Sequence, residues 1–428
     1  MPSMCLKLLP CLALIVWTGA AASRTLSGTE NRIVAAIDTR AEPALALLAE
    51  TVNVQSATEN VAGVRAVGDI YAREFRALGF ETKWVELPAA MHRAGHFVAI
   101  HRGKRGPALL LIGHLDTVLQ GEPFRRDGNR GYGTGSSDMK GGNLIVLEAL
   151  RALQSVGALR NMKINVVFTG DEEDTGSPQS VSREALFAAA KPADVALAFE
   201  GAAPGKGAIG RRGIGSWRLH VTGQQAHSSG IFSDNRGYGA IFEAARIVEQ
   251  FRTGLREPNL TYNPSVIVGG TNVTYDPATK SGTALGKTNV IPREVRVEGD
   301  IRYLGPAQLE SARQKMQAIV AQHLPLTSAE LEIENEYPSM APNPGSERVL
   351  GVLDEVSRDL GAGPVVAQPP IERGAGDIAF VCEDGRLACL DGLGAVGDHE
   401  HAPGEYIELD ALPMQVKRAA LLMYRLTR

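Results

Sequence analysis

The chain has 428 residues, a formal net charge of −4 and 21% charged residues. Its length suits two or three ordinary domains, and 44% hydrophobic residues are typical of a folded globular protein, which excludes disordered and fibrous classes. A slightly acidic chain without runs of Lys and Arg also argues against nucleic acid as a partner, because phosphates need clustered basic side chains.

Residues 1–22 have the pattern of a secretory signal peptide. Lys7 precedes an apolar run from Leu8 to Trp17, and Ala20 and Ala22 then form an Ala-x-Ala site. We expect cleavage after Ala22, or one or two residues later, and a periplasmic or secreted mature protein. An uncleaved membrane anchor is the weaker alternative, because the run is well short of the ~20 residues that span a bilayer. No later stretch is long enough, so we expect no membrane contact after cleavage.

Three short apolar runs that end in polar residues predict a parallel sheet buried on both faces. They are Ala108–Ile112, Ile164–Thr169 and Val195–Phe199, and an amphipathic helix from Asn143 to about Ser155 lies between the first two. This strand–helix–strand order favours an α/β fold with a mixed, mainly parallel sheet. Ligands of such folds bind at the carboxyl ends of the strands.

Between residues 213 and 338 the pattern changes to half-exposed strands and amphipathic helices. We expect strands at Ser216–Thr222, Ser265–Val268, Glu294–Arg302 and Glu330–Tyr337, a helix with Ile241, Ala244, Ala245, Val248 and Phe251 on its apolar side, and a helix that begins at Pro306. The order β-α-β-β-α-β is the ferredoxin-like α+β arrangement, which folds as a unit. We therefore expect an inserted domain at 213–338 between two catalytic-domain segments, 24–212 and 339–428.

Acidic residues and histidines follow the predicted strands or lie between them. They are His114, Asp116, Asp138, Glu172, Glu173, Glu200 and the segment His399-Glu400-His401. Each alone is more often structural, but together they are expected at one edge of the sheet. Carboxylates placed together repel one another unless a cation neutralises them. Mixed imidazole and carboxylate ligands suit Zn²⁺, with Co²⁺ or Mn²⁺ as substitutes.

The glycine-rich stretch from Gly133 to Gly142 does not predict a phosphate-binding loop. A P-loop needs Ser or Thr after its Lys, whereas Gly141 follows Lys140. The glycines more plausibly let the backbone pass close to a metal site.

Only two cysteines, Cys382 and Cys389, lie outside the expected signal peptide. The mature protein is therefore not a disulfide scaffold. The two residues either pair in an oxidising compartment or are buried thiols, and the sequence leaves both states open.

A series of motifs covers nearly all of the mature chain. They are Gly113-His-Leu-Asp-Thr-Val118, Tyr132-Gly-Thr-Gly-Ser-Ser-Asp-Met-Lys-Gly-Gly142, Phe168-Thr-Gly-Asp-Glu-Glu173, Gly223-Gln-Gln-Ala-His227, Thr288-Asn-Val-Ile-Pro292, Gly299-Asp-Ile-Arg302 and His401-Ala-Pro-Gly-Glu-Tyr406. In residues and order they resemble the M20 family of dinuclear zinc metallopeptidases, most closely its secreted glutamate carboxypeptidase branch. The resemblance implies a zinc-exopeptidase catalytic domain with an inserted lid that forms a homodimer.

The resemblance also implies a ligand set for two Zn²⁺ ions per subunit. Asp138 would bridge both ions, His114 and Glu200 would complete one site, and Glu173 and His401 would complete the other. His399 competes with His401 for the last position, and the spacing of His401 to the following Glu-Tyr pair favours His401.

Two further catalytic roles follow from the same resemblance. Glu172 would be the general base, although Glu172 and Glu173 are adjacent and their roles are interchangeable on sequence grounds. Asp116 would accept the remaining ring N–H of His114 and fix its tautomer.

The lid supplies a second predicted cluster by resemblance, formed by His227, Asn289 and Arg302. His227 would reach the partner subunit's site and stabilise the tetrahedral oxyanion. Asn289 and Arg302 would contact the substrate carboxylate, for which the fork of an Arg side chain is well shaped.

The chain departs from the glutamate-specific pattern at several positions. Lys206 fits a basic position near the substrate's acidic side chain, but Tyr337 stands where a second basic residue is expected. Gly376 replaces the usual Thr, residues 276–286 look like an extra lid segment, and Arg373 is a candidate to replace the lost charge.

We therefore expect a dizinc carboxypeptidase that cleaves the amide bond next to a free C-terminal carboxylate of a peptide or N-acyl amino acid. An N-acyl amino acid deacylase or a dipeptidase is the alternative on the same site. A catalytically inactive binding protein on the same scaffold is the alternative of a different class, and the complete ligand set with Glu172 argues against it.

Overall fold

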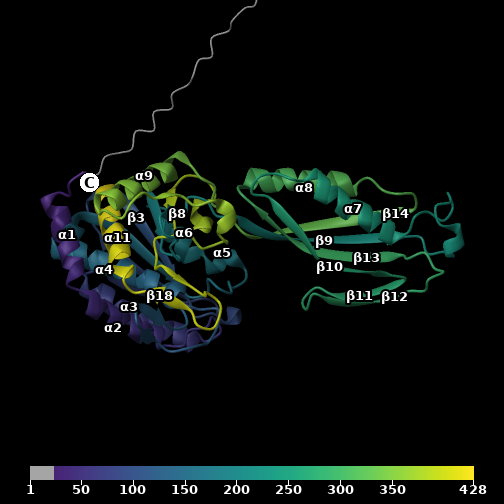
Figure 1. The fold of residues 1–428 in the computed structure, drawn as a ribbon. Helices are drawn as coiled ribbons and strands as arrows, with labels where there is room; N and C mark the ends of the chain where they lie inside the picture. The colour runs from purple at the N-terminus through teal and green to yellow at the C-terminus, as the bar shows by residue number, and fades with distance from the viewer. Residues whose placement is uncertain (1–23) are drawn as a thin grey trace, which may run out of the picture.

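The computed structural model describes residues 24–428, so the expected signal peptide lies outside the described residues. Two lobes lie side by side and are joined by a narrow connection (Figure 1). One is built around a six-stranded sheet and the other around a four-stranded sheet. Across residues 24–428, no helix has both the length and the apolar character needed to cross a membrane.

The sheet of the larger lobe is mixed and mainly parallel, as predicted. Its order is β1 (Glu81–Val85), β2 (His96–Arg102), β6 (Met162–Thr169), β3 (Arg105–His114), β7 (Val195–Ala198) and β16 (Ala388–Leu390). The last four strands are parallel to one another, and β1 and β2 add an antiparallel edge. The three predicted strands are the central ones, which confirms the α/β fold class.

Helices cover both faces of this sheet, which explains its near-continuous apolar strands. In β3, Leu109 and Leu111 face the larger core, whereas Leu110 and Ile112 face the smaller one. The larger core is covered by α1 (Gly28–Asp38), α2 (Ala41–Val52), α3 (Val61–Ala77), α4 (Gly141–Ser155), α9 (Pro344–Asp359) and α11 (Leu412–Leu426). The smaller core is covered by α6 (Glu184–Ala190) and α10 (Ala379–Cys382), next to the short α5 (Gln179–Ser182).

A disulfide links Cys382 of α10 to Cys389 of β16. The structure thus decides for the paired state, which the sequence left open.

Small sheets complete the larger lobe near its strand ends. One has the order β17 (Gly397–Asp398), β18 (Tyr406–Glu408), β5 (Arg130–Tyr132) and β4 (Arg125–Asp127). The other pairs β8 (Lys206–Gly207) with β15 (Val366–Ala367). The first sheet holds the loop of His399 and His401 beside the glycine-rich stretch.

The smaller lobe has the predicted β-α-β-β-α-β order. Its sheet runs β10 (Thr261–Gly270), β13 (Glu294–Tyr303), β9 (Gly213–Gly223) and β14 (Thr327–Tyr337), with α7 (Ala240–Gly254) and α8 (Pro306–Val320) on one face. A hairpin of β11 (Asn272–Asp276) and β12 (Ser281–Leu285) follows β10 and contains most of the predicted extra segment. We refer to this lobe as the lid.

One detail of α7 differs from the prediction. Its buried line is Ala240, Ala244, Ile247 and Phe251, whereas Ile241 is 48% exposed. Ala245 is exposed as well. Positions 241 and 245 lie about 100° around the helix from the buried line, so they lie on its flank, where Ile241 borders Gly269 of the edge strand β10.

Candidate metal centre

Asp138 is held at the start of α4 by a carboxylate from the far end of the chain. The carboxylate of Glu405 accepts hydrogen bonds from the backbone N–H groups of Gly135 (2.6 Å), Ser137 (2.8 Å) and Asp138 (2.9 Å). The turn at Ser136–Lys140 is therefore fixed before the helix begins.

Glycine is needed where α4 starts, as the sequence suggested. A Cβ atom on Gly142 would overlap the carbonyl oxygen of Phe199 at the end of β7. Without a side chain, the turn that carries Asp138 approaches the strand ends closely.

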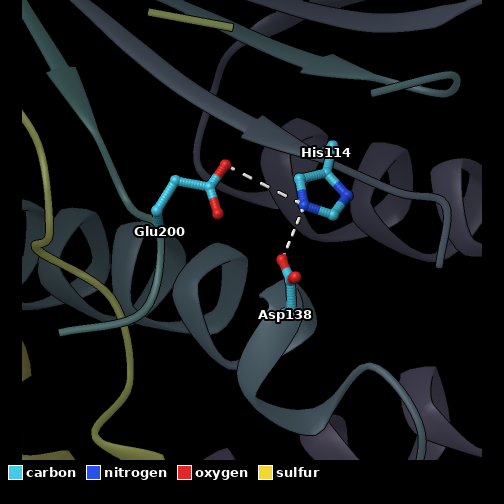
Figure 2. A group of neighbouring side chains, drawn as sticks. All are labelled: His114, Asp138 and Glu200. Atoms are coloured by element: carbon cyan, nitrogen blue, oxygen red, sulfur yellow. Dashed lines mark hydrogen bonds and ion pairs between the residues drawn. The ribbon is translucent and has the colours of Figure 1, made fainter. Parts of the chain in front are cut away.

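The two carboxylate oxygens of Asp138 face two different histidines. Its Oδ1 lies 2.9 Å from Nε2 of His114, and its Oδ2 lies 3.0 Å from Nε2 of His401. Figure 2 shows that Asp138 and Glu200 both point toward the ring of His114. Glu200 Oε1 is 3.9 Å from His114 Nε2, and Glu173 Oε2 is 3.3 Å from His401 Nε2. Two groups of ligand atoms therefore share Asp138, one with His114 and Glu200, the other with Glu173 and His401.

These donors fit a pair of divalent cations. Donor atoms on one tetrahedral zinc ion lie about 3.3 Å apart, because each bond is about 2.0 Å long. The distances here, 2.9 to 3.9 Å, bracket that value. In addition, Glu173 Oε1 is buried and has no hydrogen-bond partner among residues 24–428, and a bound cation would supply one.

The carboxylates of the cluster favour the binding of protons or cations. Hydrogen bonds that His401 donates to Asp138 and Glu173 raise its pKa to about 11, and burial raises the pKa of Glu200 to about 8. Burial also raises the pKa of Asp138, but hydrogen bonds from His114 and His401 outweigh it and lower that pKa. Protons and metal ions compete for such ligands, so metal binding here would release protons.

The nearest acceptor for the ring N–H of His114 is not the Asp116 carboxylate that was predicted. Nδ1 of His114 lies 3.1 Å from the backbone carbonyl of Asp116 and 3.5 Å from its carboxylate, so the carbonyl is the nearer acceptor. The carboxylate accepts the backbone N–H groups of Glu172 and Glu173, each at 3.1 Å, and the hydroxyl of Thr58 at 2.7 Å. Asp116 therefore holds the loop of both glutamates as well as the ring of His114.

The structure separates the surroundings of Glu172 and Glu173. Glu173 shares ligand groups with Asp138 and His401, whereas Glu172 shares one only with His114 and Glu173. Burial raises the pKa of the Glu172 carboxyl well above its usual range. Glu172 thus lies beside the ligand set rather than between its two halves.

His399 and His401 differ clearly in their contacts. His401 reaches Asp138 and Glu173, while the ring of His399 packs on Tyr406 with a centroid distance of 5.9 Å. Among the described residues, His399 belongs to none of the candidate metal-binding groups. The geometry therefore favours His401.

A cavity of about 280 Å³ opens beside the ligands, and Arg211 and Arg373 form part of its wall. Arg373 donates to the carbonyl of Gly201 at 3.0 Å, and burial followed by repulsion from Arg211 lowers its pKa. Lys206 pairs with Glu372, another wall residue, at 2.6 Å. Both predicted basic residues thus lie at or near the cavity.

The predicted lid cluster is not one cluster within this chain. A backbone hydrogen bond of 3.0 Å joins Ser228 to Asn289, which places Asn289 beside the His227 turn at the far end of β9. Arg302 pairs with Ile214 at the opposite end, next to the connection between the lobes. His227 and Asn289 are therefore separated from the connection by a strand of 11 residues, roughly 36 Å long. Arg302 lies near the connection, but its ion pair in the described chain is with Asp300 of the lid.

Two residues that help to build the site were not recognised in the sequence. Glu405 is part of the recognised His401-Ala-Pro-Gly-Glu motif, but only the fold reveals its hydrogen bonds to the Asp138 turn. Arg211 lies next to the expected domain boundary, outside the recognised motifs, so no local sequence pattern marks it. Its guanidinium lies against Gly376, where a Cβ would be 2.8 Å from Nη1, so a Thr at this position would require the Arg211 side chain to shift.

We expect the purified protein to bind about two Zn²⁺ ions per chain and to be stabilised by them. Each ion at a hundred times its dissociation constant adds ~2.7 kcal/mol to the free energy of unfolding. Metal analysis and thermal unfolding before and after chelation measure both effects. His401→Ala should lose metal, and the matched variant His399→Ala should retain it. Metal loss in His399→Ala alone would reverse the assignment.

Comparisons with known proteins agree with this geometry. The sequence pattern described as Peptidase family M20/M25/M40 matches residues 110–425. Carboxypeptidase G2 from Pseudomonas sp. (strain RS-16) is 26% identical over 423 residues, which cover 96% of each chain. Succinyl-diaminopimelate desuccinylase from Leptothrix cholodnii is 29% identical over 296 residues, which cover 66% of this chain and 74% of that protein.

Solved structures share the fold across both lobes. Aminopeptidase PepT from Bacillus cereus has a TM-score of 0.73 at 19% identity, with 91% of this chain and 99% of that chain covered. The YXEP protein from Bacillus subtilis, described as a dinuclear metal-binding peptidase, has a TM-score of 0.62 at 15% identity, with the same coverage. At these identities the similarity shows the fold alone.

Proposed function

The chain belongs to peptidase family M20/M25/M40, and we propose that it is a dizinc carboxypeptidase that cleaves the amide bond next to a free C-terminal carboxylate. Membership confirms the resemblance seen in the sequence and makes the protein a hydrolase of a metal-dependent family. The proposal rests on Asp138, which belongs to two complete ligand groups, and on Glu172, which lies next to them. The full-length similarity to carboxypeptidase G2 supports this choice of activity, with glutamate as one candidate for the released residue.

Glu172 is the group that moves the proton in this proposal. Two divalent cations, when bound, lower the pKa of a shared water and polarise the scissile carbonyl. The Glu172 carboxylate takes a proton as water adds to the carbonyl carbon, and it returns that proton to the amine as the C–N bond breaks. Asp116 keeps Glu172 in place through the backbone of its loop.

The arginine side chains fit a substrate with a free carboxylate. Arg302 lies at the connection end of the lid, where one guanidinium can bind a carboxylate in a bidentate manner. Arg211 and Arg373 line the cavity itself, so a substrate with a second acidic group also finds positive charge there.

An N-acyl amino acid deacylase or a dipeptidase remains the second candidate, because the same site cleaves any amide that fits the cavity. The similarity to a desuccinylase over 66% of this chain favours it. An inactive binding protein is disfavoured by the complete ligand groups and by the position of Glu172.

The proposal is tested by assaying the zinc-loaded mature protein against a panel of substrates. The panel contains C-terminal dipeptides, folate-like amides with a terminal glutamate, N-acyl amino acids and their carboxyl-amidated forms. Release of the C-terminal residue supports the carboxypeptidase, whereas turnover restricted to N-acyl groups supports the deacylase. No turnover of any amide by the zinc-loaded protein would overturn the proposal.

Arg302→Ala is expected to harm mainly those substrates that carry a free α-carboxylate. Loss of a charged hydrogen-bonded contact should cost roughly 2–3 kcal/mol in kcat/KM. Arg296→Ala is the matched control, because it removes a half-buried Arg from the same strand, where it pairs with Glu294. An equal loss of activity with the amidated substrate would contradict this role.

We also propose that the active enzyme is a homodimer formed through the lid. β10 is an edge strand, and exposed apolar side chains lie on it and nearby, among them Ile267 (63% exposed), Phe232 (55%) and Phe242 (50%). Exposed apolar surface of this kind is typical of interaction sites.

Secretion or export to the periplasm is likewise proposed, from the pattern of residues 1–22. The Cys382–Cys389 disulfide supports it, since disulfides persist in oxidising compartments.

A further inference from the structure

The two chain segments that join the lobes pair with each other. The backbone groups of Arg211 and Met340 exchange two hydrogen bonds of 2.9 Å. Beyond this bridge the segments enter the lid as β9 and β14. Tyr337, the last residue of β14, pairs with Ile214 of β9 and therefore belongs to the lid sheet.

The side chain of Tyr337 nevertheless lies in the catalytic lobe. Its hydroxyl is 2.9 Å from Thr175 Oγ1, 3.3 Å from the carbonyl oxygen of Glu172 and 3.3 Å from Nη2 of Arg183. Asp377 Oδ1 lies further away, at 3.4 Å. The ring packs edge-on against Phe380 at 4.8 Å, so the hydroxyl is fixed in direction as well as in position.

The loop of Glu172 is consequently held from two sides. Its backbone N–H donates to Asp116 on the metal side, at 3.1 Å. Its carbonyl accepts from Tyr337 on the lid side. Because the carboxylate extends from this backbone, a shift of the lid strand end relative to the catalytic lobe moves the carboxylate relative to the metal ligands.

The catalytic side of this contact is rigid. Arg183 is fully buried and donates to Asp377 at 2.7 Å, to Asp171 at 2.5 Å and to Thr175 at 3.0 Å. Thr169, at the end of β6, also donates to Asp377 at 2.6 Å. Among the described residues of this network, Tyr337 alone comes from the lid.

We propose that Tyr337 is a positioning residue that couples the orientation of the lid to the placement of Glu172. The lid then acts on the general base through the Tyr337 hydroxyl, in addition to any contact that it makes with substrate. This inference rests on the proposed role of Glu172 as the base. It also gives Tyr337 a role that differs from that of the basic residue expected at this position.

The test compares Tyr337→Phe with Tyr275→Phe. Tyr275 is the matched control, because its hydroxyl donates to Glu298 within the lid at 2.6 Å, and no hydrogen bond among the described residues joins it to Tyr337 or to the Glu172 loop. In metal-free and zinc-loaded protein, Tyr337→Phe should speed amide hydrogen exchange of residues 170–176 by about fivefold, because one hydrogen bond is lost. Tyr275→Phe should leave that segment unchanged.

Activity gives the second measurement. Tyr337→Phe should lower kcat by about tenfold with little change in KM, since a misplaced base slows the chemical step without weakening substrate binding. In a Glu172→Gln background the same substitution should have no further effect on the residual rate. An equal loss in both backgrounds, or unchanged exchange and kcat in Tyr337→Phe, would overturn the inference. Faster exchange in a protein that hydrolyses no substrate would instead refute the proposed function and leave the contact intact.

Discussion

Glu172→Gln is expected to lower kcat by ~10²–10⁴-fold and to leave the metal content unchanged. Glutamine has nearly the same shape but cannot take a proton from water at neutral pH, so proton transfer is lost. The metal ligands stay complete, because among the described residues Glu172 is in neither of the two ligand groups that share Asp138. Steady-state kinetics and metal analysis of the same preparation measure both results.

Two further variants distinguish the role of Glu172 from the roles of neighbouring acidic residues. Glu400→Gln removes an acidic side chain from the wall of the same cavity, where Glu400 bonds to Ser137, and it should retain most of the activity. Glu173→Gln should lose metal together with activity, because Glu173 contacts His401 directly. If Glu172→Gln lost metal while Glu173→Gln kept it, the roles of the two glutamates would be exchanged.

His227→Ala is expected to lower the rate by ~10²–10³-fold. A partner subunit with an intact His227 should restore the lost activity. Within one chain, Nδ1 of His227 accepts the N–H of Ser229, and the residue is exposed at the far end of β9. That end is separated from the chain's own metal centre by the length of the lid sheet. A histidine there can stabilise the oxyanion only in another subunit's site.

Complementation provides the measurement. Inactive Glu172→Gln and His227→Ala chains are mixed in equal amounts and allowed to exchange subunits. Random exchange makes half of the dimers mixed, and each mixed dimer has one site with both residues intact, so about a quarter of the wild-type activity should return. Exchange confirmed by mass spectrometry without recovered activity would show that His227 does not act across the dimer.

The central strands of the larger sheet, the order of elements along the lid and the metal-ligand candidates were predictable from the sequence. Near-continuous apolar runs such as those in β3 and β6 predict strands buried on both faces, and alternation in β9 and β13 predicts a sheet covered on one face. Since parallel strands end at one edge, the acidic residues after them were expected to meet there. These features depend on local periodicity, which a single sequence contains.

Only the tertiary structure decided how the two halves of the site are arranged. Asp138 meets His401 and the carboxylate of Glu405 across more than 260 positions of sequence, and no local pattern encodes such a distance. The same reason explains the nearer carbonyl contact of Asp116, the separation of Arg302 from His227, and the reach of Tyr337 from the lid to Glu172. Sequence periodicity fixes which face of a strand is buried, whereas the contacts at the strand ends depend on how separate elements pack together.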